Sequence, residues 1–350
     1  MKANAARWWW LAVLAVLAPP AGVAAETPAP FTESEIRAIL AHGPWPVPIV
    51  GDPRNRVSGK REAIEFGERL FFERRLSASG KFSCGTCHVP ERNWTDNQTR
   101  GSAIAEVDRN TPTLMNARLG RRFGWDGATD SLWTQSMRPM LDARELGASP
   151  RHVAEVVRRD EQLECRYRKA FGAAPPATDD EAVLADVARA LAAFQETLES
   201  PPTPFDQFRN ALARGERITP LVYSEAAQRG LRIFIGKGTC SSCHSGPNFS
   251  DGGLHDNGFS AYARTGRPDT GSNGRFKVPT LRHLLLTAPY GHHGEIGTLG
   301  DAVKHYSERG SSELKPLKLT AGEQSDLVVF LESLSTFGNP WRPEDTGRCH

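Results

Sequence analysis

The chain has 350 residues, of which 24% are charged and 39% hydrophobic, and its formal net charge is +2. This balance excludes an intrinsically disordered protein, which needs low hydrophobicity and high net charge. It also argues against nucleic acid as a partner, because phosphate binding needs a concentrated basic surface. The length predicts about two domains.

The first predicted element is a secretory signal peptide over residues 1–25. Lys2 and Arg7 give a basic start, an apolar run follows over 8–17, and small residues at 23–25 suit cleavage. An uncleaved membrane anchor is the alternative. A spanning helix needs about 20 residues, however, and the apolar run is shorter than that. We therefore expect an exported protein, periplasmic in a Gram-negative bacterium, without stable membrane insertion.

The rest of the chain shows helical spacing of its apolar residues. An N-terminal arm is expected over 26–60, with a short helix at 33–41. Further helices are predicted from about 61 and over 151–168, 179–198, 224–234, 299–307 and 321–334, with loop-rich segments at 81–150 and 236–280. No set of alternating strands is apparent, so the pattern predicts an all-α, loop-rich fold.

One pattern occurs twice: a helix, the motif Cys-x-x-Cys-His, and a loop. The motif stands at 84–88 and at 240–244, and a Pro-Thr-Leu follows each copy, at 112–114 and 279–281. The repeat predicts two related domains. We place them at 61–205 and 206–340, with a C-terminal tail at 341–350.

The two pentapeptides carry the chemistry, because Cys-x-x-Cys-His is the attachment signal for c-type haem. Two thiols one helical turn apart can reach both vinyl groups of one porphyrin, and the adjacent histidine then ligates the iron. A zinc site would leave the two histidines unexplained, and a redox CxxC does not explain two copies beside histidines. We predict two covalent haems, held by Cys84, Cys87 and His88 and by Cys240, Cys243 and His244.

Two cysteines remain, Cys165 and Cys349. In an oxidising compartment they could form a disulfide. The alternative is two independent thiols, since a sequence does not give the distance between them.

The remaining histidines and methionines bear on the other axial ligand of each haem. No methionine follows Met140, so the second haem lacks that ligand within its own domain. The candidates there are His255, His283, His292, His293, His305, Tyr290 and Tyr306. No histidine lies between His88 and His152, which predicts an open side on the first haem. An open haem beside a closed one suggests a reactive site supplied by an electron relay.

Together with these motifs, several further segments resemble the bacterial dihaem cytochrome c peroxidase and MauG family. They are 67–71 (GERLF), 109–114 (RNTPTL), 123–127 (FGWDG), 191–194 (LAAF), 204–206 (PFD), 276–282 (FKVPTLR) and 287–290 (TAPY). The resemblance covers about 61 to 340 and implies two cytochrome c-like domains with one haem each.

The resemblance also implies roles for individual residues. Gln135, Pro139 and Glu145 match the segment that lines the peroxide site at the first haem, and Glu145 matches the acid/base that assists O–O cleavage. Trp125 matches the tryptophan between the haems. Without the resemblance, Glu145 would be taken as an ordinary helix-end charge and Trp125 as a core aromatic.

A calcium ion between the domains is a further implication of the resemblance. Asn110 and the backbone carbonyls of Thr287 and Pro289 match the family's ligands. Oxygen ligands suit Ca²⁺, although three protein ligands leave the other positions to water.

The sequence departs from classical peroxidases in two places. Those enzymes carry a histidine in the loop after the first motif, whereas 89–109 contains none. They also use a methionine on the second haem, where Tyr306 stands here, as in MauG-type members. His305 is the competing ligand, but neighbouring helix residues face different ways and the family alignment favours Tyr306.

The resemblance implies that hydrogen peroxide is reduced at the first haem with electrons relayed through the second. The electrons would come from a small donor protein, a cytochrome c or a cupredoxin, or from residues of a protein substrate as in MauG. A dihaem electron carrier without substrate chemistry is the alternative. The sequence leaves the donor, the choice between peroxidase and MauG-like activity, and the oligomeric state open.

Overall fold

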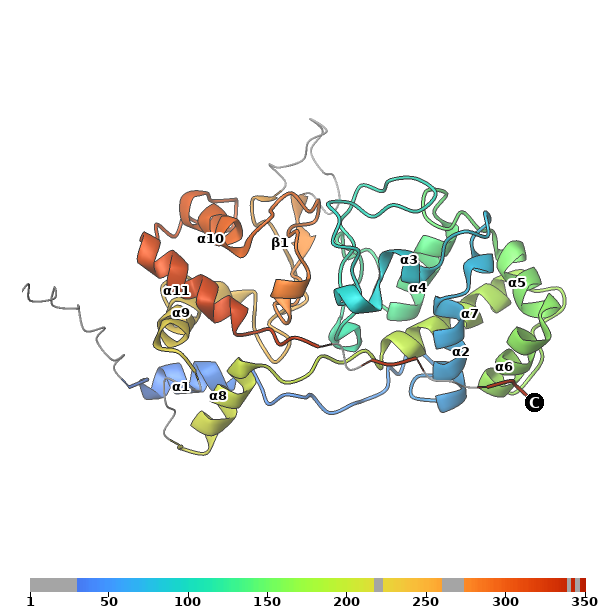
Figure 1. The fold of residues 1–350 in the computed structure, drawn as a ribbon, viewed down its shortest axis with the longest axis horizontal. Helices are drawn as coiled ribbons and strands as arrows, with labels where there is room; N and C mark the ends of the chain where they lie inside the picture. The colour runs from blue at the N-terminus through green and yellow to red at the C-terminus, as the bar shows by residue number, and fades with distance from the viewer. Residues whose placement is uncertain (1–29, 217–222, 260–273, 339–340, 344–346) are drawn as a thin grey trace, which may run out of the picture.

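The computed structural model describes residues 30–216, 223–259, 274–338, 341–343 and 347–350 (Figure 1). The predicted signal peptide lies outside these residues. Within them, no helix combines the length and the apolar character needed to cross a membrane.

The described chain is mostly helical, which confirms the predicted class. The helices are α1 (Glu33–Leu40), α2 (Arg61–Phe71), α3 (Cys84–Cys87), α4 (Leu132–Leu141), α5 (Pro150–Arg159), α6 (Glu161–Phe171), α7 (Asp180–Gln195), α8 (Pro204–Ala213), α9 (Glu225–Ile235), α10 (Leu299–Glu308) and α11 (Ala321–Glu332). Short 3₁₀ turns include η4 (Cys240–Ser242). Two short strands, β1 (Leu254–His255) and β2 (Phe276–Lys277), pair antiparallel.

The segment predicted to be helical over 151–168 is helical, but the chain divides it into α5 and α6. Asp160 separates them with an extended backbone, φ −97° and ψ 114°. Its carboxylate accepts hydrogen bonds from the backbone N–H groups of Gln162 and Leu163 and so caps α6. A capping side chain at this position favours the start of a new helix over the continuation of α5.

The buried apolar residues form two main clusters, one in each half of the molecule. The first cluster draws on α2 and α4 to α7, and the second on α1 and α8 to α11. Phe205 and Phe208 of α8 both belong to the second cluster. The predicted boundary at 205/206 therefore falls inside α8, and the division between the clusters lies before Pro204.

The two halves repeat one helix contact. Gly67 of α2 packs on α7, where an added Cβ would overlap the carbonyl oxygen of Ala190. Gly230 of α9 packs on α11 in the same way, against the carbonyl oxygen of Asp326. A side chain at either glycine would separate its helix pair, so the repeated glycines permit the close approach.

The two ends of the chain each cover the half that is more distant in sequence. Near the N-terminus, α1 packs beside α8 and α9, and the chain then runs along the molecule to α2 (Figure 1). Near the C-terminus, Trp341 packs on Trp94 and Phe72 of the first half.

The disulfide that the sequence left open is present. Cys165 of α6 is bonded to Cys349, with their Cα atoms 6.0 Å apart. Arg166 also donates a hydrogen bond of 2.6 Å to the carbonyl oxygen of Gly347. The C-terminal segment is thereby fixed to α6 by a covalent bond and by polar contacts.

Candidate active site

The first Cys-x-x-Cys-His motif forms a short helical turn that orients its histidine. Ser83 caps α3, and His88 follows directly after the helix. The Nδ1 atom of His88 donates to the carbonyl oxygen of Trp94 at 3.0 Å, which leaves Nε2 for a metal. Burial lowers the pKa of His88, so the ring is held in the neutral form that a metal needs.

The second motif repeats this arrangement. The Nδ1 atom of His244 donates to the carbonyl oxygen of Phe249 at 3.0 Å. The threonine of each Pro-Thr-Leu then fixes the loop: Thr113 Oγ1 donates to the carbonyl of Asn93, and Thr280 Oγ1 to that of Asn248, at 2.7 and 2.8 Å. The predicted repeat is thus a repeat of histidine orientation as well as of sequence.

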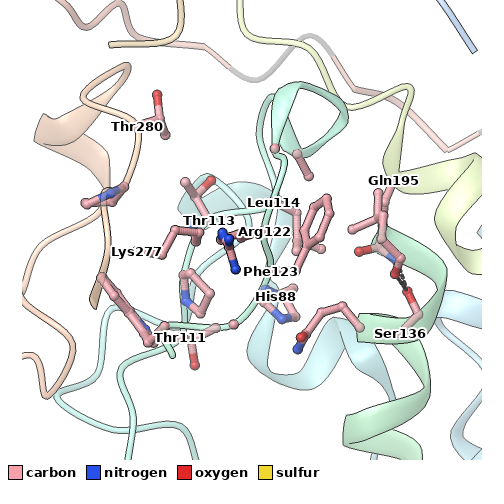
Figure 2. A pocket seen from close by; sticks show the side chains of 18 of the residues that line it. His88, Thr111, Thr113, Leu114, Arg122, Phe123, Ser136, Gln195, Lys277 and Thr280 are labelled. Atoms are coloured by element: carbon pink, nitrogen blue, oxygen red, sulfur yellow. Dashed lines mark hydrogen bonds between the residues drawn. The ribbon is translucent and has the colours of Figure 1, made fainter. Parts of the chain in front are cut away.

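A cavity of about 1000 Å³ lies beside the first motif. Cys84 and Cys87 line it. So do His88 and, from the second half, Lys277 and Thr280 (Figure 2). Burial raises the pKa of the Cys84 thiol to about 12 and that of Cys87 to about 11. Two thiols and one imidazole facing a large, partly apolar space fit a covalently attached haem.

Gln135, Pro139 and Glu145, which the family resemblance assigned to the peroxide site, all line this cavity, and their roles stay predictions. Gln135 accepts a hydrogen bond from Thr129 Oγ1 at 2.9 Å through its amide oxygen. Burial raises the pKa of the Glu145 carboxyl, and the negative charge of Asp142 adds to this shift. A half-buried carboxyl whose pKa is raised holds its proton more readily than an exposed one, which suits a group that both accepts and donates a proton.

Pro139 and Tyr306 occupy equivalent places in the two halves. Each is the eighth residue of its helix, α4 or α10, and each helix is capped by a hydroxyl side chain, Ser131 or Thr298. Proline offers no ligand atom, whereas tyrosine offers a phenol oxygen. The repeat therefore supports an open site beside His88 and a closed one beside His244.

Tyr306 lies near the second motif, close enough for the Cys240 and Cys243 thiols to add to the effect of burial in raising its pKa. An iron ion would be needed to ionise the phenol there. The competing His305 instead places Nε2 2.9 Å from the carbonyl oxygen of Asn257. Most of the other candidates form hydrogen bonds elsewhere. These are His255 with Asp251 and Glu313, His283 with Pro201, His293 with Asp108, and Tyr290 with Leu284.

Trp125 lies at the contact between the halves, where two backbone hydrogen bonds run in opposite directions. The Lys277 N–H donates to the carbonyl of Trp125 at 2.9 Å, and the Asn110 N–H donates to that of His292 at 3.0 Å. The Trp125 indole donates to the carbonyl of Asn110 at 2.8 Å. Trp125 also lines the cavity, so its ring is fixed between the two halves.

The segments that carry the predicted calcium ligands both contact residues 97–98. The amide nitrogen of Asn110 donates to the carbonyl of Gln98 at 2.8 Å. The neighbouring Asn97 donates to the carbonyls of Leu286 and Ala288, on either side of Thr287. These bonds tie Asn110 and the 287–289 loop to one segment of the first half, and the calcium site itself stays a prediction.

Comparison with known proteins now adds to this geometry. The family model for di-haem cytochrome c peroxidase matches residues 61–214. The methylamine utilization protein MauG of Methylorubrum extorquens is 34% identical over 325 residues, which cover 89% of this chain and 88% of that protein. The chain belongs to the di-haem cytochrome c peroxidase and MauG family. Its members are peroxidase-type oxidoreductases, so the predicted enzyme class is confirmed.

Other members of the family are similarly related. The cytochrome c551 peroxidase of Nitrosomonas europaea is 32% identical over 289 residues, covering 78% of this chain and 80% of that protein. A crystal structure of a MauG-like protein associated with microbial copper homeostasis matches with a TM-score of 0.69 and 28% identity, covering 85% of this chain and 98% of that chain. A di-haem family implies two haems, in agreement with the two motifs.

The sequence did not single out two residues that the structure makes prominent, one in the cavity and one in the core of the second half. Lys277 lines the cavity, and burial lowers its pKa to about 8. Arg282, two residues after Thr280, forms a fully buried ion pair with Asp206 at 2.8 Å. Both belong to the segment that resembles the family, but only their tertiary contacts show what they touch.

Proposed function

We propose that this chain is a periplasmic di-haem enzyme that reduces hydrogen peroxide in the cavity beside His88. The observation that carries the proposal is the composition of that cavity. His88 is the only histidine among its described lining residues, and Glu145 lines it as a half-buried carboxyl. A site with one imidazole and a nearby acid/base has room for a small substrate to bind and be protonated.

A bound haem would supply the iron that binds peroxide and would pass electrons to the peroxide. The protein's own part is to move protons and exclude competing ligands. Glu145 takes a proton from one peroxide oxygen and delivers it to the other, so that O–O cleavage releases water. Gln135, whose amide oxygen is already engaged by Thr129, keeps its N–H groups as donors toward the substrate.

Electrons would enter through the haem held by Cys240, Cys243 and His244, with Tyr306 as its other ligand. Trp125, fixed between the halves, is the proposed station between the two haems. Positive charge on Lys277 at the cavity suits the carboxylates of a haem. A calcium ion on Asn110, Thr287 and Pro289 would stiffen the contact between the two halves.

A MauG-like reaction, in which residues of a protein substrate supply the electrons, is the second candidate. The equivalence of Tyr306 with Pro139 favours it, because a phenolate ligand stabilises oxidised iron. Residues 89–109 contain no histidine, so they also lack the loop histidine that classical peroxidases carry after the first motif.

Peroxide titration of the purified holo-protein, with and without a reduced cytochrome c or cupredoxin, tests these alternatives. Rapid oxidation of the donor is the result expected of a peroxidase. A persistent oxidised state that ignores the donor indicates the MauG-like reaction. A ferric spectrum with only six-coordinate low-spin haem, unchanged by peroxide, would instead identify an electron carrier without substrate chemistry.

A further inference from the structure

A pair of tryptophans leads from the first haem-binding motif to the protein surface. The carbonyl of Trp94 accepts the hydrogen bond from His88, and its indole is 0% exposed. The ring of Trp341 lies edge-to-face on that indole, with centroids 5.2 Å apart. Trp341 itself is partly exposed. Two indoles in contact therefore span the distance from the partner of His88 to solvent.

This contact is built by the fold. Trp341 also packs on Phe72, with ring centroids 5.6 Å apart, and Phe72 in turn covers Gly85 of α3. Beyond Trp341, the disulfide between Cys165 and Cys349 anchors the end of the chain to α6. The C-terminal segment thus holds Trp341 against the first half.

The second half has no such pair at the equivalent place. Phe249 stands where Trp94 does, and a phenyl ring is much harder to oxidise than an indole. Trp45 lies beneath the Arg282 guanidinium at 3.7 Å, and the positive charge there opposes loss of an electron. An oxidisable route to the surface is therefore specific to the half that holds Glu145.

The environment of Trp94 suits electron transfer without proton transfer. Its Nε1 atom is buried and has no hydrogen-bond partner among the described residues. An oxidised Trp94 can then not pass its indole proton to a neighbour, so the step is easily reversed. Trp341, by contrast, is partly exposed.

We propose that Trp94 and Trp341 form a one-electron relay between the peroxide site and the surface of the first half, separate from the route through Trp125. This inference rests on the proposed function, with peroxide as the oxidant: H2O2 + 2 H+ + 2 e− gives 2 H2O. A one-electron protein donor at Trp341 supplies the electrons one at a time. Without a donor, Trp341 is itself oxidised, and tryptophan plus H2O2 gives hydroxytryptophan plus H2O.

The test treats the holo-protein with stoichiometric peroxide in the absence of a donor and locates oxidised residues by peptide mass spectrometry. We expect hydroxytryptophan at Trp341 in the natural protein and only background oxidation there in Trp94→Phe. That variant keeps the backbone carbonyl for His88, and Phe249 shows that the repeat accepts phenylalanine at this position. The matched control is Trp133→Phe, since Trp133 is partly buried beside Arg189; it should leave Trp341 oxidation unchanged.

The outcomes separate this relay from the proposed function. Normal peroxide consumption with equal Trp341 oxidation in the natural protein and Trp94→Phe overturns the relay alone, because peroxide then attacks Trp341 from solvent. No reaction with peroxide overturns both proposals. Freeze-quench electron paramagnetic resonance gives an independent check. In Trp341→Phe, a tryptophan radical confined to Trp94 supports the relay. In the natural protein, the absence of a radical from both Trp94 and Trp341 contradicts it.

Discussion

The two halves of this molecule share one scaffold and differ at a few positions. Gly67 and Gly230 make the same close helix contact, and His88 and His244 are held by equivalent backbone carbonyls. Pro139 in the first half takes the place that Tyr306 has in the second. Met115 and Arg282, two residues after Thr113 and Thr280, differ as well.

The position two residues after each of these threonines shows the contrast clearly. Met115 and Arg282 each donate a backbone hydrogen bond of 3.1 Å to the preceding threonine hydroxyl. Met115 lines the cavity of the first half, whereas Arg282 forms a buried ion pair in the second. The same backbone geometry thus presents an apolar side chain to the cavity in one half and a buried, paired charge in the other.

The largest expected effect is on the ligand that closes the second site. In the proposed function, Tyr306→Phe removes the phenol oxygen, so the low-spin ferric signal of that haem should be lost. Electron paramagnetic resonance of the holo-protein measures this. His305→Gln is the control and should keep the signal, since His305 contacts Asn257. An unchanged signal in Tyr306→Phe would show that another group ligates the iron.

Removal of the acid/base from the open site should slow peroxide reduction strongly. We expect Glu145→Gln to lower the rate about 10²- to 10⁴-fold, the usual contribution of a positioned proton carrier. Stopped-flow mixing with peroxide measures it.

The pH dependence of the same reaction follows from the raised pKa of Glu145. The ionised carboxylate accepts the first proton, so the rate should fall as pH drops through a value above the ordinary 4.5. Asp142→Asn removes a negative charge that raises this pKa and should move the acid limb to lower pH. A limb that does not move would assign it to another group.

The buried ion pair of the second half should matter more than any exposed pair. Arg282→Met copies the residue of the first half but leaves Asp206 buried and uncompensated, at a cost of about 3–5 kcal/mol in the free energy of unfolding. Arg229→Met, at a partly exposed pair with Asp326, should cost about 0–1 kcal/mol. Denaturant unfolding of the holo-proteins compares them, and equal losses would refute the contrast.

The shared helix contact should give the smallest effects, equal in both halves. Gly67→Ala and Gly230→Ala each force a Cβ into a backbone carbonyl and should destabilise by about 1–3 kcal/mol. Gly322→Ala in α11 has nothing within 4 Å of the added Cβ and should be neutral or slightly stabilising. A loss confined to one half would mean that the two contacts are not equivalent.

Much of this architecture could be read from local patterns. The spacing of apolar residues predicted α7, α9, α10 and α11 to within a few residues, because each helix has one face in a core. The break at Asp160 was missed, since its capping role competes with an apolar period that continues on both sides. The boundary near 205 was placed too late, because α8 belongs to the second core through Phe205 and Phe208.

The sequence by itself determined the two Cys-x-x-Cys-His motifs, the repeat and the absence of methionine after Met140, because these depend only on residue type and spacing. Tertiary structure alone decided that Cys165 meets Cys349, that Trp341 lies on Trp94, and that Lys277 and Glu145 line one cavity. Those pairs are far apart along the chain. Their proximity follows from how the helices pack, which no local pattern records.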